Sequence, residues 1–595
     1  MEYSKAIKGG EFLIRDSSPE DIFIPEDWDE EQKMIAEMCR EFLDKEITPK
    51  LVQIDAAEDG LMVRLLDKAA ELGLLGVSVP EEYGGLGKDF VTSMLVTERL
   101  GAGHSFAVAY AAHTGIGTLP ILYYGDEQQK MKYIPKLASG EWKGAYCLTE
   151  PEAGSDANSG KTRAALSAGG RFYILNGQKM WITNAGFADV FTVFAKIDDD
   201  DDLSAFIVEK SFGGIELGAE EHKMGIKGSS TRQVFFNDCK VPVENLLSER
   251  GNGFKIAVNI LNLGRIKLGG AALGAAKEVI NHAVQYANER VQFGHKIAGY
   301  GAIQYKLAEQ AIRAFAMESA TYRASRDIES ATKALIEEGL EAQQAKLRGT
   351  EQFAVEAAIV KVLASEALDY IVDEGVQIYG GMGFSAEAPM ERSYRDSRIN
   401  RIFEGTNEIN RMLTADMLFK RAMKGQLDLI SAAKNVAEEL LAIPDYSDQI
   451  NKTPLAGEQK AVAGFKKAVL LVAGAAVQRL MTKLADEQEI LMYLADMLID
   501  VYAAESMCLR VQKILISGKD DLIPEKTAMV QTFVYDAAGR IYTAGRNALN
   551  AFEEGDEKRM MLMGLKRFTK VREMNTVKLR RQIAAKLTGE NKYCF

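Results

Sequence analysis

One carboxylate in this sequence has neighbours that suit acid–base chemistry. Glu404 lies between the apolar Phe403 and Gly405, in the stretch RINRIFEGTNEI at 398–409. Gly405 allows the backbone to turn where a side chain would block a ligand. Burial among apolar residues raises the pKa of a carboxylate, because it disfavours the charged form. Such a glutamate can act as a general base near neutral pH, although a solvated glutamate at a helix end is the alternative on this stretch alone.

Four further stretches combine residues that could hold a ligand. They are YCLTEPEAGSD at 146–156, WITN at 181–184, ERVQFG at 289–294 and QIYGGMGF at 377–384. Taken singly, each has a structural alternative, since the tryptophan could be a core residue and the glycine cluster could end a helix. Five consecutive aspartates at 198–202 indicate a solvated turn and not an ion site, because no spaced ligands accompany them.

Composition excludes several classes of protein. The chain has 595 residues, of which 47% are hydrophobic and 26% charged, the balance of a soluble protein with several domains. A formal net charge of −13 argues against a nucleic-acid-binding protein, which needs a basic face. The five cysteines and five histidines show no metal-ligand spacing, so we expect no metal site and a reducing, cytoplasmic setting.

The sequence predicts neither a secretory signal nor a membrane-spanning helix. The N-terminus lacks the residue order of a secretory signal. The longest apolar run, 468–477, falls short of the roughly 18–20 residues that a membrane-spanning helix needs.

The elements that position these residues follow from periodicity. Residues 1–28 are irregular, and we expect a surface arm. Residues 29–142 have a helical period, with Asp29 and Gln32 as a capping box at its start. Residues 143–252 contain short strands and predict an antiparallel β domain, in which 171–177 ends in Asn-Gly and predicts a tight turn.

The helical period returns after the strands and continues to the end of the chain. Residues 253–426 predict a helical bundle that carries Glu404, and 427–595 predict an extra helical block. Helices, strands and helices in this order predict an α+β fold, with the β domain between two helical domains. The long helices expected in the bundle are 254–290, 301–328, 340–379 and 408–424.

The motifs, in this order along the chain, resemble the acyl-CoA dehydrogenase family. The resemblance is continuous over about 30–425. The length of the chain after 430, with Phe403 and Asn407, is most similar to the very-long-chain branch and its bacterial relatives. The resemblance implies FAD as cofactor and oxidation of a long-chain fatty acyl-CoA to trans-2-enoyl-CoA in fatty acid β-oxidation.

The resemblance also implies how Glu404 works. Glu404 would take the α-proton while N5 of FAD takes the β-hydride, and the Glu404 N–H with a ribityl hydroxyl would bind the thioester oxygen. Some relatives carry the base on a helix, just before an arginine. That position here is Gly264, before Arg265, so Glu404 is the available base and an isovaleryl-type enzyme is disfavoured.

Further site residues are implied by the same resemblance. Those expected to bind FAD are Tyr146, Leu148, Thr149, Ser155, Trp181, Thr183, Arg290, Phe293, Gln377, Gly380, Gly381, Thr406 and Asn407, with Gln377 and the two glycines coming from a neighbouring subunit. Those expected to bind substrate are Ser155 near the CoA chain, Asn262 and Arg265 near its nucleotide end, and Phe403 and Gly405. Tyr300-Gly301 stands where many short- and medium-chain members have a glutamine, which agrees with the very-long-chain branch.

Partners follow from the resemblance as well. It implies a homodimer, electron-transfer flavoprotein as the electron acceptor, and a C-terminal block that can rest on a membrane. The apolar stripe within 461–473 could form that membrane face, but we expect it to pack against the chain. Two alternatives share the motifs: an acyl-CoA oxidase, which returns electrons to oxygen, and a non-catalytic assembly factor on the same fold.

Overall fold

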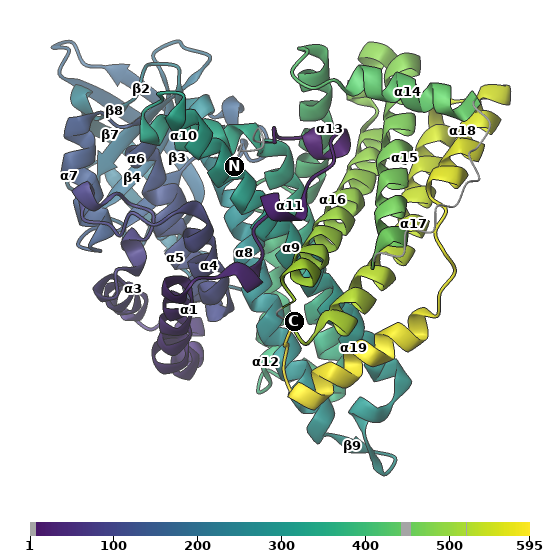
Figure 1. The fold of residues 1–595 in the computed structure, drawn as a ribbon. Helices are drawn as coiled ribbons and strands as arrows, with labels where there is room; N and C mark the ends of the chain where they lie inside the picture. The colour runs from purple at the N-terminus through teal and green to yellow at the C-terminus, as the bar shows by residue number, and fades with distance from the viewer. Residues whose placement is uncertain (1–6, 442–453, 519) are drawn as a thin grey trace.

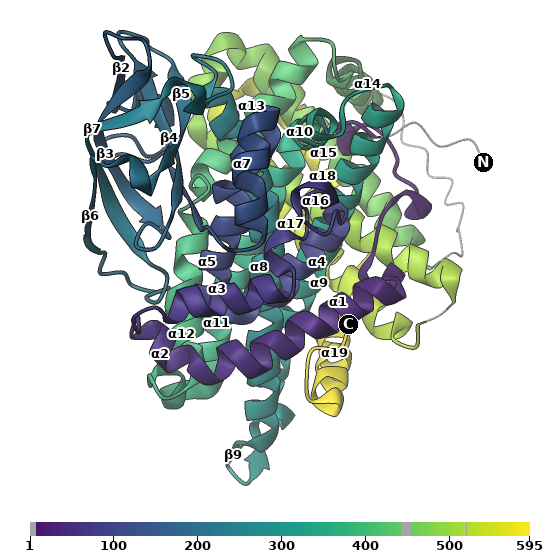
Figure 2. The same ribbon diagram turned by 90° about the vertical axis from the view of Figure 1, so that its left-hand side faces the viewer.

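The structure is a computed structural model that describes residues 7–441, 454–518 and 520–595. A helical N-terminal region and a single large sheet lie on one side of a long helical bundle, and the C-terminal helices lie on the other (Figure 1). Figure 2 shows the sheet standing beside α7 and α5. The α+β prediction, with the strands between two helical regions, is confirmed.

The N-terminal helices begin where side chains cap them. Asp29 accepts a hydrogen bond from the Gln32 N–H, and Gln32 returns one to the Asp29 N–H, so the predicted capping box is confirmed. Asp126 and Gln129 form a second capping box. The α-helices of this region are α1 Glu30–Phe42, α2 Leu51–Asp55, α3 Leu61–Glu71, α4 Phe90–Leu100, α5 Ser105–Ala111, α6 Leu119–Tyr124 and α7 Glu127–Ala138.

The sheet is mixed, which corrects the prediction of an antiparallel domain. Strands β1 and β2 both run parallel to β4, while the other pairs are antiparallel, in the order β6-β7-β3-β2-β4-β5-β8. The strands are β1 Gly144–Cys147, β2 Arg163–Leu166, β3 Phe172–Thr183, β4 Val190–Ile197, β5 Leu203–Glu209, β6 Ile215–Glu220, β7 Thr231–Pro242 and β8 Leu246–Leu247. Two-residue strands β9 Val291–Gln292 and β10 His295–Lys296 form a separate hairpin that projects from the bundle (Figure 1).

Asn176-Gly177 does not form the predicted hairpin turn. β3 continues through it, and the pairing with β7 shifts register between Leu175 and Gly177. A β-bulge uses glycine for the same reason that a turn does, since both need backbone angles that side chains disfavour. A Cβ on Gly177 would also lie 2.5 Å from Oγ1 of Thr162, so only glycine fits here.

The bundle is built on two long helices packed side by side with a third. They are α8 Gly253–Glu289, α9 Gly301–Glu337 and α11 Ala354–Tyr379, followed by α12 Pro389–Ser397 and α13 Asn407–Met423. The helix predicted over 340–379 is two helices, because α10 Ala342–Gln352 ends at Phe353 before α11 begins.

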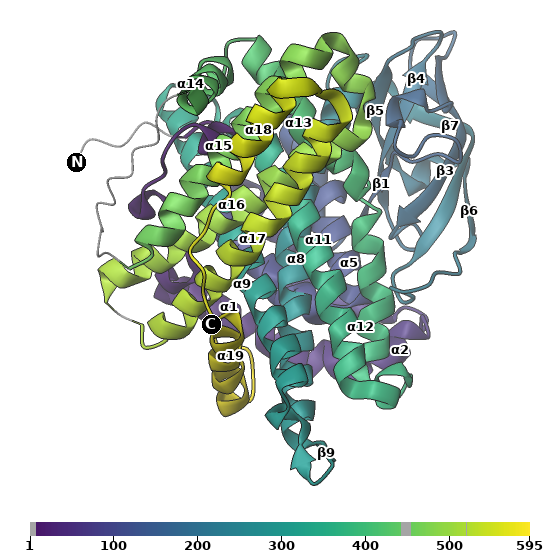
Figure 3. The same cartoon turned by 90° about the vertical axis from the view of Figure 1, so that its right-hand side faces the viewer.

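The C-terminal block shares the hydrophobic core of the bundle, and Figure 3 shows its helices lying along α8, α9 and α11. The apolar stripe predicted in this block lies on α15 and is buried, including Phe465 and Val472. The stripe therefore packs against the rest of the chain and does not form an exposed membrane face. The helices are α14 Leu429–Leu441, α15 Ala456–Leu480, α16 Gln488–Ser517, α17 Ile523–Phe552, α18 Gly555–Phe568 and α19 Thr576–Glu590.

Within the described residues, three helical segments are long and apolar enough to cross a membrane, which corrects the expectation from run lengths. They are Ser105–Tyr124, Gly253–Glu289 and Ala456–Asp486, and 72%, 72% and 61% of their apolar windows are buried inside the protein. Packing within the fold therefore accounts for most of their apolar surface.

The described part of the predicted surface arm, residues 7–28, buries several of its apolar side chains. Phe12 and Leu13 are buried in the bundle core, and Ile22 and Ile24 pack on Leu509 of α16. Residues 7–28 therefore join the bundle to the C-terminal block.

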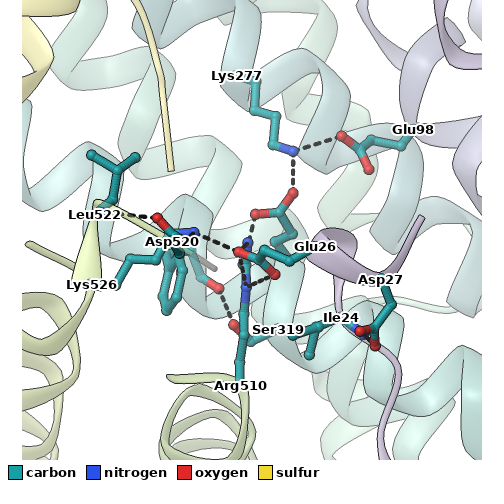
Figure 4. Close-up of polar contacts among 12 residues, drawn as sticks. Ile24, Glu26, Asp27, Glu98, Lys277, Ser319, Arg510, Asp520, Leu522 and Lys526 are labelled. Carbon is teal, nitrogen blue, oxygen red and sulfur yellow. Dashed lines mark hydrogen bonds and ion pairs between the residues drawn. The ribbon is translucent and has the colours of Figure 1, made fainter. Parts of the chain in front are cut away.

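A network of charged side chains connects the N-terminal stretch, the bundle and the C-terminal block (Figure 4). Arg510 of α16 is 1% exposed and donates to Glu318 of α9 at 2.8 Å and to Glu26 at 2.7 Å. Lys277 of α8 pairs with Glu318 and, at 2.7 Å, with Glu98 of α4. Burial acts to raise the pKa of Glu26, but the cations of Arg510 and Lys526 lower it to about 2.

Breaking this network should destabilise the fold more than breaking a surface pair. Arg510→Met leaves the carboxylates of Glu318 and Glu26 with one cation fewer, and removing one partner of a buried pair costs about 3 kcal/mol or more. We expect the melting temperature in calorimetry to fall by roughly 2–3 °C, because a chain of 595 residues has a large entropy of unfolding. The control is Arg559→Met, because Arg559 and Asp556 form an exposed pair that is worth less than about 1 kcal/mol. Equal melting temperatures for both variants would contradict the structural role of the network.

Candidate active site

Glu404 occupies a strained turn between 3-10 helix η15, Arg398–Arg401, and α13. Its φ is +58° and that of Gly405 is +80°, so two consecutive residues are left-handed. Such a conformation costs about 1–3 kcal/mol in a residue that has a side chain, and it persists only where the surroundings impose it. The turn points the Glu404 side chain into a cavity whose wall it helps to form.

Three side chains hold the carbonyl groups of this turn. Arg265 donates to the Glu404 carbonyl at 3.2 Å, and Lys361 donates to the Gly405 carbonyl at 2.7 Å. Asn410 donates from its amide to the carbonyls of Glu404, Gly405 and Thr406, at 3.3, 2.8 and 3.0 Å. These bonds from α8, α11 and α13 impose the strained backbone.

The carboxylate of Glu404 rests on Gly264 of α8. A Cβ at position 264 would lie 2.6 Å from the Glu404 Oε2 atom, so no side chain fits beneath the carboxylate. A base at position 264 and a base at 404 would therefore occupy the same space. The Glu404 carboxylate can hold this position because residue 264 is a glycine, and a glycine has no side chain that could act as a base.

The environment of Glu404 makes its carboxylate more basic. Burial raises its pKa to about 7, against the opposing charges of Arg265 and Lys361. Its Oε2 atom is buried and has no hydrogen-bond partner, and the same is true of the hydroxyl of Tyr146. Burial raises the pKa of Tyr146 well above its usual value, and the nearby charge of Glu404 adds to that effect.

The cavity has a volume of about 500 Å³ and runs along one face of α8. It is lined on α8 from Ile260 and Gly264, through Ala271 and Ala275, to His282. The other walls come from α4 and α5 of the N-terminal region, from α11 and from α12, and they include charged side chains such as Arg99 and Asp396 as well as apolar ones. Thr183, at the end of β3, reaches the same cavity.

The residues predicted to line a flavin ring lie together near this cavity. Trp181 has a φ of +60° and sits in an irregularity of β3, between Lys179 and Ile182, that turns its side chain outward, leaving it 51% exposed. The Thr149 carbonyl accepts from the Met180 N–H, which joins the two predicted stretches. Tyr146 and Leu148 are buried at the end of β1.

The residues predicted to bind the parts of FAD other than its flavin ring lie outside the cavity and are exposed to solvent. Phe293 is 93% exposed at the tip of the β9–β10 hairpin, and Arg290 at the base of that hairpin is also exposed. Gln377, Gly380 and Gly381 form an exposed group where α11 ends, and Ser155 is exposed on the loop after β1.

Two pairs of predicted ligand residues have other roles in the structure. Asn262 and Arg265 do not line the cavity; both are buried, and the Arg265 guanidinium donates to Asn262 and to the Glu404 carbonyl. Thr406 caps α13 by accepting from the Ile409 N–H. Asn407 is buried. Its amide oxygen accepts a hydrogen bond from Lys361, and its amide nitrogen donates to Ser365 and Glu366.

Three residues of the site were not predicted from the sequence. Lys361 and Asn410 hold the Glu404 turn, but a lysine and an asparagine within helical stretches have no sequence pattern that marks such a role. Lys267 lines the cavity one turn along α8 from Gly264, and burial lowers its pKa to about 8. A charged residue within the apolar stripe of a long helix was the available signal for Lys267.

Family comparisons agree with this architecture. The chain matches the acyl-CoA dehydrogenase N-terminal domain over residues 29–141 and the middle domain over 145–239. It matches two C-terminal domain descriptions of the same family, over 251–419 and 464–567. The chain belongs to the acyl-CoA dehydrogenase family.

Individual relatives extend the match over the whole chain. A probable acyl-CoA dehydrogenase of Bacillus subtilis is 46% identical over 98% of both chains. The very long-chain specific acyl-CoA dehydrogenase of Rattus norvegicus is 39% identical, over 79% of this chain and 73% of its own length. The crystal structure of a Bacillus anthracis acyl-CoA dehydrogenase complexed with FAD superimposes with a TM-score of 0.96, at 46% identity, over 99% of this chain and 100% of that one.

Adding one methyl group beneath the carboxylate should impair this dehydrogenase. The Cβ of Gly264→Ala would displace Glu404, and misplacing a catalytic group by about 1 Å can cost about 10²-fold in rate. We expect kcat to fall by roughly that factor while the flavin absorbance of the purified protein stays the same. The control is Gly539→Ala in α17, where a Cβ meets no atom within 4 Å. A Gly264→Ala enzyme with a kcat within twofold of the wild type would contradict the packing of Glu404 on Gly264.

The rate should also follow the protonation of Glu404. A base must be ionised, so the rate of flavin reduction in a single turnover should fall about tenfold per pH unit below pH 7. Lys361 lowers the pKa of Glu404, so Lys361→Met should move the fall to higher pH, whereas Lys333→Met on the surface should not. A fall that begins only near pH 4.5, the usual carboxyl range, would contradict the buried environment.

Proposed function

We propose that this enzyme carries out the FAD-dependent α,β-dehydrogenation of long-chain fatty acyl-CoA thioesters, giving trans-2-enoyl-CoA in fatty acid β-oxidation. The observation that carries the proposal is the Glu404 carboxylate, which is desolvated, lacks a hydrogen-bond partner at Oε2 and faces the cavity along α8. A carboxylate in this state is a stronger base than one in water.

Glu404 removes the proton from Cα of the bound thioester. The negative charge that then develops moves toward the thioester oxygen, which needs a hydrogen-bond donor. The backbone N–H of Glu404 is available for this purpose, because within the described residues it donates to no protein group. A backbone N–H that no protein group accepts is free to donate to a ligand, which supports its use toward the thioester oxygen.

The residues around the cavity fit FAD. Aromatic surface is open where the ring and the adenine are expected, at Trp181 and Phe293, and exposed Arg290 can form paired hydrogen bonds to phosphate oxygens. Tyr146, Leu148, Thr149 and Thr183 would border the ring. The chemistry supplied by bound FAD is acceptance of the hydride from Cβ.

The length of the cavity supports a long-chain substrate. Its lining on α8 extends from Gly264 to His282, which corresponds to ~27 Å at 1.5 Å per helical residue. An extended carbon chain with bonds of ~1.52 Å and angles of ~111° advances ~1.25 Å per carbon. The cavity therefore has room along α8 for an acyl chain of roughly 20 carbons.

The remaining parts of the proposal concern partners. Electrons leave the reduced enzyme to electron-transfer flavoprotein, and the enzyme works as a cytoplasmic homodimer. The exposed group at Gln377, Gly380 and Gly381, together with Phe384 at 87% exposure, offers a surface for the second subunit and its FAD. A site with an intact base and open flavin contacts argues against the purely non-catalytic assembly role.

One pair of measurements tests the reaction and the acceptor. Glu404→Gln should bind FAD and acyl-CoA and remain yellow, but lose turnover by about 10²-fold or more, because the amide cannot take a proton. Wild-type enzyme reduced anaerobically by palmitoyl-CoA should react slowly with oxygen and rapidly with electron-transfer flavoprotein. Turnover that survives in Glu404→Gln would show that the base is another group, and rapid reoxidation with peroxide release would indicate an oxidase.

A further inference from the structure

The far end of the cavity is formed by the last residues of the chain. Lys592 and Tyr593 line the same cavity as Glu404, although they follow the final helix of the C-terminal block. Figures 1 and 3 show the end of the chain running from α19 back toward α8 and α9. Asn281 of α8, which also lines the cavity, accepts a hydrogen bond at 2.8 Å from the Tyr593 N–H.

Several contacts hold this C-terminal tail, residues 591–595, in place. Asn288 of α8 donates from its amide to the Thr588 carbonyl at 2.9 Å and to the Asn591 side chain at 2.8 Å. The rings of Tyr593 and Phe595 pack edge to face, with centroids 5.8 Å apart. The tail is therefore attached to α8 at two points about two helical turns apart, and its position depends on specific side chains of that helix.

Paired charges line the cavity beside the tail. Lys277 of α8 lies 5.5 Å from the centre of the Tyr593 ring and is bound by Glu98 and Glu318, the residues at one end of the buried network. Lys277 and Glu98 are themselves part of the cavity wall. The Tyr593 hydroxyl is buried and has no hydrogen-bond partner. The Tyr593 ring is therefore the group at this end whose size can change without unpairing a charge.

We propose that Tyr593 closes the acyl cavity and thereby sets the longest acyl chain that the enzyme accepts. This inference rests on the proposed function and adds a specificity-determining segment to it. From Gly264, where the carboxylate sits, to Asn281, where the tail is attached, the helix rises ~26 Å. The limit is imposed from the C-terminal block, which lies far from the reacting atoms in the sequence, and not by the bundle alone.

The test compares chain-length profiles among variants of the full-length enzyme. The variants are Tyr593→Ala, Tyr593→Trp and a chain that ends at Asn591, with Tyr535→Ala on α17 as a matched control outside the cavity. For each, kcat/KM is measured with saturated acyl-CoA thioesters of increasing length, and the melting temperature is recorded. None of the changed residues belongs to the proposed catalytic or flavin-binding groups.

We expect the wild type to show a steep fall in kcat/KM beyond a certain length. Tyr593→Ala and the shortened chain should raise kcat/KM about tenfold for the first thioester beyond that length, because two more methylene groups can be buried. The gain should come through KM, with kcat for shorter chains unchanged. Tyr593→Trp should move the limit to shorter chains, and the control should match the wild type.

The outcomes separate this inference from the proposed function. A wild-type enzyme without long-chain activity would overturn the proposed function. A wild-type enzyme with that activity, whose length limit is the same in Tyr593→Ala and Tyr593→Trp, would overturn the inference alone. An equal loss at every chain length would also overturn it, since it would indicate that the tail stabilises the fold without selecting substrate.

Discussion

The structure depends on keeping one carboxylate dry. Removing Glu404 from water raises its free energy when it is charged, and the protein supplies the means to hold it there. These means are two left-handed residues, three donors to their carbonyl groups, and a glycine on the facing helix that leaves room for the carboxylate. The donors bind the backbone of the turn and not the carboxylate itself. The charge is thus positioned without a hydrogen-bond partner at Oε2, which preserves its basicity.

The charges around Glu404 also leave its carboxylate basic. Arg265 and Lys361 lower the pKa of Glu404 but do not bring it back to the value of a solvated glutamate. Many other buried ions of the bundle are paired, as Arg510 is with Glu318 and Lys277 with Glu98. Glu356 of α11 also has a buried Oε2 atom without a hydrogen-bond partner, but only Glu404 of these two glutamates faces the cavity, as expected for a functional group.

The sequence was sufficient to predict the order of the helical and β regions, and it singled out Glu404, whose role as the base stays a prediction. Helical and strand periods differ clearly, and the Phe403–Glu404–Gly405 pattern marks a carboxylate beside a turn. The sequence was insufficient where one residue type can take several structural roles. Asn176-Gly177 suits a turn and a bulge equally, and Thr406 and Asn407 can bind a ligand or begin a helix. In the structure Thr406 caps α13 and Asn407 bonds to neighbouring side chains, while their predicted contacts with FAD stay predictions.

Residues brought together from distant parts of the chain were also beyond sequence analysis. Nothing in the sequence around Lys361 or Asn410 relates them to Glu404, because their contact depends on how α11 and α13 pack. The N-terminal stretch was expected on the surface because it has no helical period, but Phe12 and Ile24 bury their side chains from short 3-10 segments and loops. Tertiary packing, which periodicity does not encode, decides such cases.

The central claim is that the Glu404 carboxyl group is desolvated in the folded enzyme. Infrared difference spectroscopy measures this directly, by titrating the protonated carboxyl band of the wild type against that of Glu404→Gln. The account predicts a band, absent from the variant, that is lost with a midpoint near pH 7. A band that disappears near pH 4.5, or a difference spectrum without a carboxyl band, would contradict it.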